Sequence, residues 1–96
     1  MSRTNIRVSK AALDDFAGAA AAEELTTSQA IRREIKRYIK TPRNIRHVDI
    51  GEDQVIKQIR IDDDLYNEFK TACANDGVKS SDVVRDIIMR KLRKVR

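Results

Sequence analysis

The sequence has little of several residue types that would point to a particular class of protein. It has no tryptophan, and aromatic residues make up only 4%. That is too few for the platforms on which single-stranded nucleic acids and RNA bases stack. A single cysteine excludes an internal disulfide framework. No apolar run approaches the roughly 20 residues of a membrane span, and the N-terminus lacks the apolar core of a signal peptide. We therefore expect a cytoplasmic protein that does not associate with membranes.

Positive charge is in excess, with 20 Lys and Arg against 15 Asp and Glu and a formal net charge of +5. The 96 residues fit one domain, and a hydrophobic content of 41% allows a modest core. A basic balance favours a polyanionic partner such as nucleic acid. Many small proteins nevertheless carry a similar charge for solubility alone, so charge leaves both interpretations open.

The most informative feature is an ungapped internal repeat at a spacing of 53 residues. Residues 5–40 align with residues 58–93, and the apolar positions stay in phase throughout. Identical pairs include Ile6/Ile59, Arg7/Arg60, Phe16/Phe69, Ser28/Ser81, Arg32/Arg85 and Ile35/Ile88. We interpret this as a duplication within one domain, residues 1–96. Repeat one spans 3–40, a linker spans 41–55, and repeat two spans 56–96.

Each copy predicts one strand followed by two helices. Polar and apolar residues alternate over 5–8 and 58–61, which predicts strands of four or five residues. Helices are expected over about 11–23 and 26–39 in the first copy, and over 64–75 and 79–94 in the second. Ser9 and Asp62 are candidate N-caps. Acidic residues are expected in the first turns that follow them, where the helix dipole favours negative charge: Asp14, Asp15, Asp63 and Asp64.

Neither copy is expected to fold alone, because 36 residues fall below the roughly 40 at which unassisted folding becomes unusual. Each strand also lacks a partner within its own copy. We predict that the two strands pair antiparallel and that all four helices pack on one face of the ribbon. The residues expected to point into the core are Ile6, Val8, Ile59 and Ile61. The outward face would then carry amide and guanidinium side chains from both copies.

The second helix of each copy opens with a similar segment, LTTSQAIR over 25–32 and VKSSDVVR over 78–85. With the strand–helix–helix order, these segments resemble the ribbon-helix-helix (MetJ/Arc/CopG) superfamily. Two copies in one chain are more similar to the TraY family of conjugation proteins. The resemblance implies a mainly α fold in which two tandem β-α-α repeats form an intramolecular pseudo-dimer with a two-stranded antiparallel ribbon. It implies a sequence-specific double-stranded DNA-binding protein that acts as a transcriptional regulator, or as a relaxosome accessory protein at a plasmid transfer origin.

The outward ribbon positions suit base recognition in the major groove. That groove admits a two-stranded ribbon, where Arg matches guanine O6/N7 and Asn or Gln matches adenine N6/N7. The candidate base-reading residues are Arg3, Asn5, Arg7, Gln58 and Arg60. Ile56, the counterpart of Arg3, could contact only a thymine methyl group. Because the half-ribbons differ, we expect an imperfect palindrome or a direct element as the target. The alternative is a solvated edge that blocks aggregation.

The start of each second helix is a candidate phosphate site, since free N–H groups and the helix dipole attract anions there. Such contacts fix the register on DNA without reading sequence. The candidate residues are Thr26, Thr27 and Ser28 in the first copy, and Lys79, Ser80 and Ser81 in the second. The alternative is ordinary helix capping, which is compatible with phosphate contact.

No enzyme is predicted, because no nucleophile stands with a base and no glycine-rich phosphate loop occurs. No cofactor or metal is expected either. Cys73 is interpreted as a small buried apolar residue and His47 as a loop residue. A relaxase, other relaxosome proteins and further copies on adjacent sites are candidate partners. Two alternatives stay open: an antitoxin whose C-terminal segment wraps a toxin, and an architectural binder with steep salt dependence but no base preference.

Overall fold

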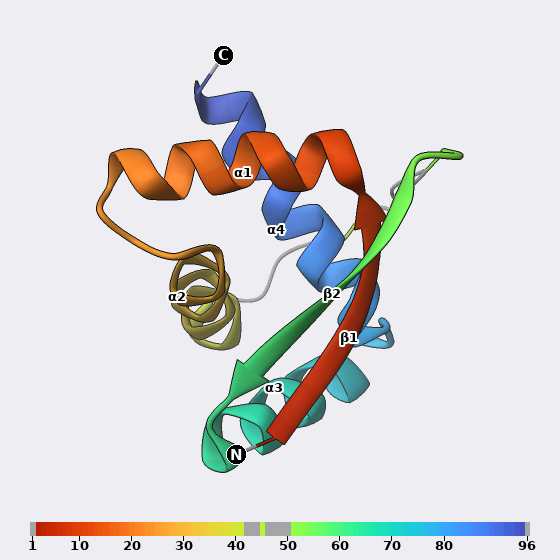
Figure 1. The fold of residues 1–96 in the computed structure, drawn as a ribbon. Coiled ribbons are helices and arrows are strands. Elements are labelled where there is room, and N and C mark those ends of the chain that lie inside the picture. The colour runs from red at the N-terminus through yellow and green to blue at the C-terminus, as the bar shows by residue number, and fades with distance from the viewer. Residues whose placement is uncertain (1, 42–44, 46–50, 96) are drawn as a thin grey trace.

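The computed structural model describes residues 2–41, 45 and 51–95. This part of the chain is mainly helical, with a two-stranded antiparallel sheet and four helices (Figure 1). In chain order the elements are β1 (Ser2–Ser9), α1 (Lys10–Ala22), α2 (Thr27–Lys40), β2 (Gln54–Ile61), α3 (Asp63–Asp76) and α4 (Ser80–Val95). The predicted order of one strand and two helices per copy is confirmed.

Both strands are longer than predicted, with eight residues each instead of four or five. β2 begins at Gln54, inside the predicted linker 41–55. The extension arises because Gln54 pairs with Ser9, the last residue of β1. The Lys10 N–H then donates to the Asp53 carbonyl at 2.8 Å, one residue beyond the ladder. Pairing across the ribbon therefore supplies hydrogen-bond partners that a single-copy pattern does not reveal.

The register separates the ribbon into a core face and an outward face. Asn5 lies opposite Gln58 at the middle of the ladder, and Ile6 lies opposite Lys57. The four apolar residues predicted to enter the core are all buried: Ile6, Val8, Ile59 and Ile61. The helices pack against this face, with α1 and α4 on β1 and α2 on β2. Burial of one face fixes the register, because a slip of one residue would turn these side chains toward water.

Both predicted N-caps are confirmed, whereas one prediction about the first helical turns is wrong. The side chains of Ser9 and Asp62 each accept a hydrogen bond from the third residue beyond them, at 3.4 Å, as predicted N-caps. Asp63 and Asp64 lie in the first turn of α3. The first turn of α1 has no acidic residue, because α1 begins at Lys10. The prediction that Asp14 and Asp15 lie in that turn is therefore wrong.

The turn between the two helices has the same backbone form in both copies. Gly77 adopts a left-handed conformation with φ of 68°, and Glu24, 53 residues earlier, has φ of 61°. The N–H of the next residue then bonds back across the turn, from Leu25 to Ala20 at 2.9 Å and from Val78 to Cys73 at 3.0 Å. Glycine adopts this conformation without steric cost, whereas a glutamate does not.

The core lies between the ribbon and the helices and is lined by both copies. Phe16, Ile31, Ile35 and Tyr38 from the first copy pack with Phe69, Val84, Ile88 and Leu92 from the second. The Tyr38 and Phe69 rings meet edge to face at 6.1 Å. In α1, Ala20, one turn beyond Phe16, is buried, and Ala12 packs half-buried against the core.

Contacts between the copies occur in matching pairs, in which each residue of one contact has its repeat counterpart, 53 residues away, in the other contact. Tyr38 donates to the Asp76 carboxylate, and Lys91 donates to the Glu23 carboxylate at 3.0 Å. At the helix level, α1 packs mainly against α4 while α2 packs against α3. Each first helix of a copy therefore contacts the second helix of the other copy.

Candidate nucleic-acid interface

The side chains on the outward face of the ribbon are exposed to solvent. All five candidate base-reading residues are exposed: Arg3, Asn5 and Arg7 on β1, and Gln58 and Arg60 on β2. Ile56 completes this face and is 63% exposed, although it is a large aliphatic side chain. We call these six residues the ribbon face. Alternation along both strands places them there, because residues two apart share a side of a strand.

Cross-strand pairing arranges the ribbon face as three opposed pairs. Asn5 faces Gln58 at the centre, Arg3 faces Arg60 toward one end, and Arg7 faces Ile56 toward the other. No side-chain hydrogen bond or ion pair joins the arginines or amides of this face to another described residue. These donors and acceptors are therefore available to an external partner. Like charges directly opposite one another, as at Arg3 and Arg60, also destabilise a ribbon that lacks an anionic partner.

Two arginines behind the ribbon hold its backbone to the second helices. Arg32 of α2 donates from Nη1 to the carbonyl of Arg60 at 2.9 Å. Arg85 of α4 makes the matching bond to the carbonyl of Arg7 at 3.0 Å. The sequence shows both residues in the repeated helix-start segment but gives no indication that they reach the strand of the other copy. Two of the three ribbon-face arginines, Arg7 and Arg60, thus have their backbone carbonyls held by a second arginine.

The start of α2 is capped reciprocally. The Thr26 hydroxyl accepts from the Gln29 N–H at 3.1 Å, and the Gln29 side chain accepts from the Thr26 N–H at 2.9 Å. This capping box uses two of the free N–H groups. The N–H groups of Thr27 and Ser28 have no partner among the residues described. Both are half-buried, and they keep the hydroxyl and N–H donors that a phosphate would accept.

The start of α4 differs from that of α2. Ser80 accepts from Lys70 Nζ, and Ser81 accepts from Arg85 Nη2, both at 3.4 Å. Lys79 precedes the helix and is exposed. Asp82 lies in the first turn, where its carboxylate pairs with Arg85 at 2.6 Å. Because one guanidinium contacts both Ser81 and the Arg7 carbonyl, this helix start lies beside the ribbon. All six candidate phosphate residues therefore lie at the helix starts expected from the sequence.

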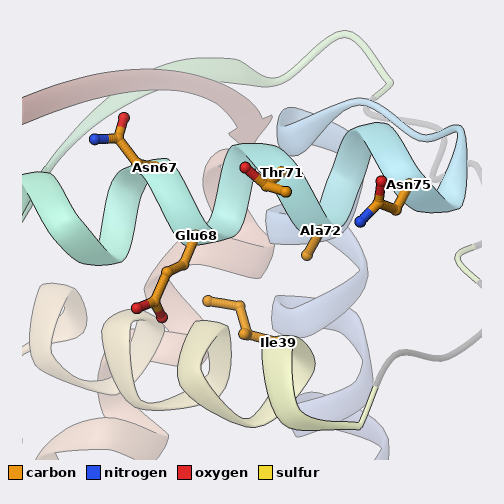
Figure 2. Close-up of a pocket in the computed structure, with 6 residues that line it drawn as sticks. All are labelled: Ile39, Asn67, Glu68, Thr71, Ala72 and Asn75. Carbon is orange, nitrogen blue, oxygen red and sulfur yellow. The ribbon is translucent and has the colours of Figure 1, made fainter.

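A shallow groove lies elsewhere, between α2 and α3 (Figure 2). Glu68 and Ile39 extend toward one another across it, while Asn67 points away from α2. The lining also includes Thr71, Ala72 and Asn75. Glu68 is the one titratable group of this lining.

The sequence analysis also singled out Cys73 and His47. Cys73 is 3% exposed in the core, as predicted for a small apolar side chain. Burial raises the pKa of its thiol above the usual value, which disfavours the reactive thiolate. His47 lies outside the described residues. Among the residues that are described, no group of three His, Cys, Asp or Glu side chains is arranged to hold a metal ion. No helix in that part of the chain is long and apolar enough to cross a membrane.

Comparison with known proteins does not assign the chain to a family. No protein-family model, curated protein or solved structure matches it. The ribbon face and the helix starts are therefore interpreted from their own chemistry.

Proposed function

We propose that this chain is a sequence-specific double-stranded DNA-binding protein that inserts its β1–β2 ribbon into the major groove. The observation that carries the proposal is the ribbon face, which presents exposed arginine and amide side chains without partners in the described structure. Guanidinium and amide groups match the edges of guanine and adenine in that groove. An ordinary solvated edge does not require arginine and amide residues at matching positions of both strands.

The tandem ribbon-helix-helix pseudo-dimer is part of this proposal. Four features that recur 53 residues apart support it: the capping side chains, the left-handed turn residues, the α1–α4 and α2–α3 packing, and the arginine bonds to the opposite strand. A pseudo-two-fold axis would pass between Asn5 and Gln58. One chain would then offer both halves of the ribbon without a concentration-dependent dimerisation step.

In this proposal, the starts of α2 and α4 bind phosphate groups of the DNA backbone. Thr27 and Ser28 would donate to one phosphate group, and Lys79 with the Ser80 and Ser81 hydroxyls would contact another. Arg32 and Arg85 connect these helices to the ribbon, so a phosphate contact at the helix start fixes the depth of the ribbon in the groove. The net charge of +5 adds affinity that depends on salt and not on sequence.

The resemblance to ribbon-helix-helix and TraY proteins supports two cytoplasmic settings for this binding. One is regulation of a promoter. The other is accessory binding at a plasmid transfer origin, together with a relaxase, other relaxosome proteins or further copies on adjacent sites. Both settings require the same base recognition by Arg3, Asn5, Arg7, Gln58 and Arg60. A test of that recognition therefore precedes any choice between them.

The test is selection of binding sites from a randomised duplex pool, with the wild type and an Arg7→Ala/Arg60→Ala variant. We expect the wild type to enrich a short motif. The variant should lose about 2–6 kcal/mol on that motif, which is at least ~30-fold in Kd, since each bidentate contact contributes about 1–3 kcal/mol. It should keep weak, salt-sensitive binding.

An Arg37→Ala/Lys40→Ala variant is the matched control. This variant also removes two positive charges, but it removes them from exposed positions in the last turn of α2. We expect it to keep the motif of the wild type. Enrichment of no motif by the wild type would contradict base recognition. Binding without base preference would instead indicate an architectural protein.

A further inference from the structure

The two ends of the ribbon face are chemically different. One end carries two opposed guanidinium groups, from Arg3 and Arg60, and the other carries Arg7 opposite Ile56. The central Asn5–Gln58 pair has an amide on each strand and is therefore nearly symmetric. The outward surface of the ribbon thus has a direction, which depends on the register and not on either strand alone.

The difference in charge extends behind the ribbon. Arg32, bonded to the Arg60 carbonyl, has no carboxylate within ion-pair distance among the described residues. Arg85, bonded to the Arg7 carbonyl, is paired with Asp82 at 2.6 Å. The residue of the first copy that corresponds to Asp82 is the neutral Gln29, which is engaged in the capping box. On the ribbon face and directly behind it, the Arg3–Arg60 end therefore carries more guanidinium charge that no carboxylate pairs, although Asp62–Asp64 follow β2 at that end and begin α3.

This clustering favours base edges that accept hydrogen bonds at the Arg3–Arg60 end. Guanine presents two acceptors, O6 and N7, to a guanidinium in the major groove. Two guanines, one for each arginine, would satisfy both side chains and offset the repulsion between them. A single guanine would leave one guanidinium without a base partner.

Ile56 imposes the opposite preference at the other end. An isoleucine can neither donate nor accept a hydrogen bond, so over guanine or cytosine it would remove water from polar atoms without replacing it. Over thymine it would cover the C5-methyl group. Its exposed aliphatic surface would then become buried, which is favourable.

We propose that the ribbon reads its DNA element in one direction, with a G·C-rich step beneath Arg3 and Arg60 and a thymine beneath Ile56. This inference rests on the proposed insertion in the major groove. It identifies Ile56 as a specificity-determining residue, and it makes the bound element asymmetric even though the fold repeats.

The experiment is duplex-pool selection with the wild type, Ile56→Arg and the conservative variant Ile56→Val. The wild type should enrich guanines at one end of its motif, and one guanine with a thymine at the other. Ile56→Arg should replace that thymine by guanine, with a preference of roughly five-fold or more, and make the motif nearly palindromic. Ile56→Val should keep the thymine.

The outcomes separate this inference from the proposal on which it rests. If the wild type enriches no motif, base reading by the ribbon is itself wrong. If it enriches a palindromic motif, or if Ile56→Arg leaves the motif unchanged, directional reading is wrong while insertion in the groove stands. Position 56 is exposed, so thermal unfolding should show that all three proteins are folded.

Discussion

Arg85 of α4 donates from Nη1 to the backbone carbonyl of Arg7 in β1 at 3.0 Å, while its Nη2 reaches Asp82 at 2.6 Å. This guanidinium connects the end of the ribbon to the first turn of α4, and 12% of its side chain is exposed. The two bonds come from the two terminal nitrogens of a rigid planar group, and lysine, whose donors all lie on one nitrogen, does not reproduce that geometry. We expect Arg85→Lys to lower the free energy of unfolding by about 1–3 kcal/mol in urea titrations.

Arg37→Lys is the control for that prediction. Arg37 makes an ion pair with Glu34 on the surface of α2, and 60% of its side chain is exposed. We expect this variant to change the unfolding free energy by less than about 0.5 kcal/mol. Equal effects of the two substitutions would show that the contact between Arg85 and the ribbon does not stabilise the fold.

Two isoleucines of β2 should differ sharply in their contribution to stability. Ile59 is fully buried in the core, whereas Ile56 is 63% exposed on the ribbon face. Ile59→Ala should cost about 2–5 kcal/mol, because it removes buried methylene groups and leaves a cavity. Ile56→Ala should stay within about 0.5 kcal/mol of the wild type. Similar losses in chemical unfolding would contradict the register of the ribbon.

Substitutions at the turn residues Glu24 and Gly77 should have opposite effects on the stability of the fold. Gly77 has φ of 68° and open space around its Cα, so Gly77→Ala would be strained by its backbone alone. It should destabilise by about 1 kcal/mol. Glu24→Gly should stabilise by up to about 1 kcal/mol, since φ of 61° disfavours a glutamate. A loss of stability in Glu24→Gly, measured by thermal unfolding, would show that the Glu24 side chain contributes more than its backbone costs.

Glu23 joins three helices and should make stability depend on pH. Hydrogen bonds from Arg33 and Lys91 lower the pKa of this carboxyl below its usual 4.5. A lowered folded-state pKa means that the stabilisation is complete above the unfolded pKa and is lost as pH falls through the folded pKa. Glu23→Gln should therefore have a lower Tm than the wild type at neutral pH. The two Tm values should converge in acid, and a difference independent of pH would contradict this assignment.

The faces of the elements could be predicted from the sequence because burial imposes a period. Alternation over 5–8 and 58–61 identified the buried isoleucines and the exposed arginines and amides. Helical periodicity likewise accounts for the burial of Phe16, Ile35 and Ile88. The extra strand length at Gln54 could not be predicted, since it depends on pairing with Ser9 in the other copy.

Contacts between residues far apart in the sequence also could not be predicted from the local sequence pattern. The repeat places Arg32 and Arg85 at matching positions, but only the packing of each second helix against the ribbon gives them their carbonyl partners. The difference between the ribbon ends likewise depends on register, because Arg3 is opposite Arg60 and not opposite its own counterpart Ile56. Sequence indicates which residues face outward, and tertiary pairing decides which of them act together.

The most direct test is binding to a selected duplex in which one functional group of a guanine is removed at a time. 7-Deazaguanine lacks the N7 acceptor of the major groove, whereas inosine lacks only the amino group of the minor groove. With the ribbon in the major groove, 7-deazaguanine at the positions read by Arg3, Arg7 or Arg60 should raise Kd roughly five-fold or more. Inosine at the same positions should leave Kd nearly unchanged. Weaker binding with inosine but not with 7-deazaguanine would contradict the account.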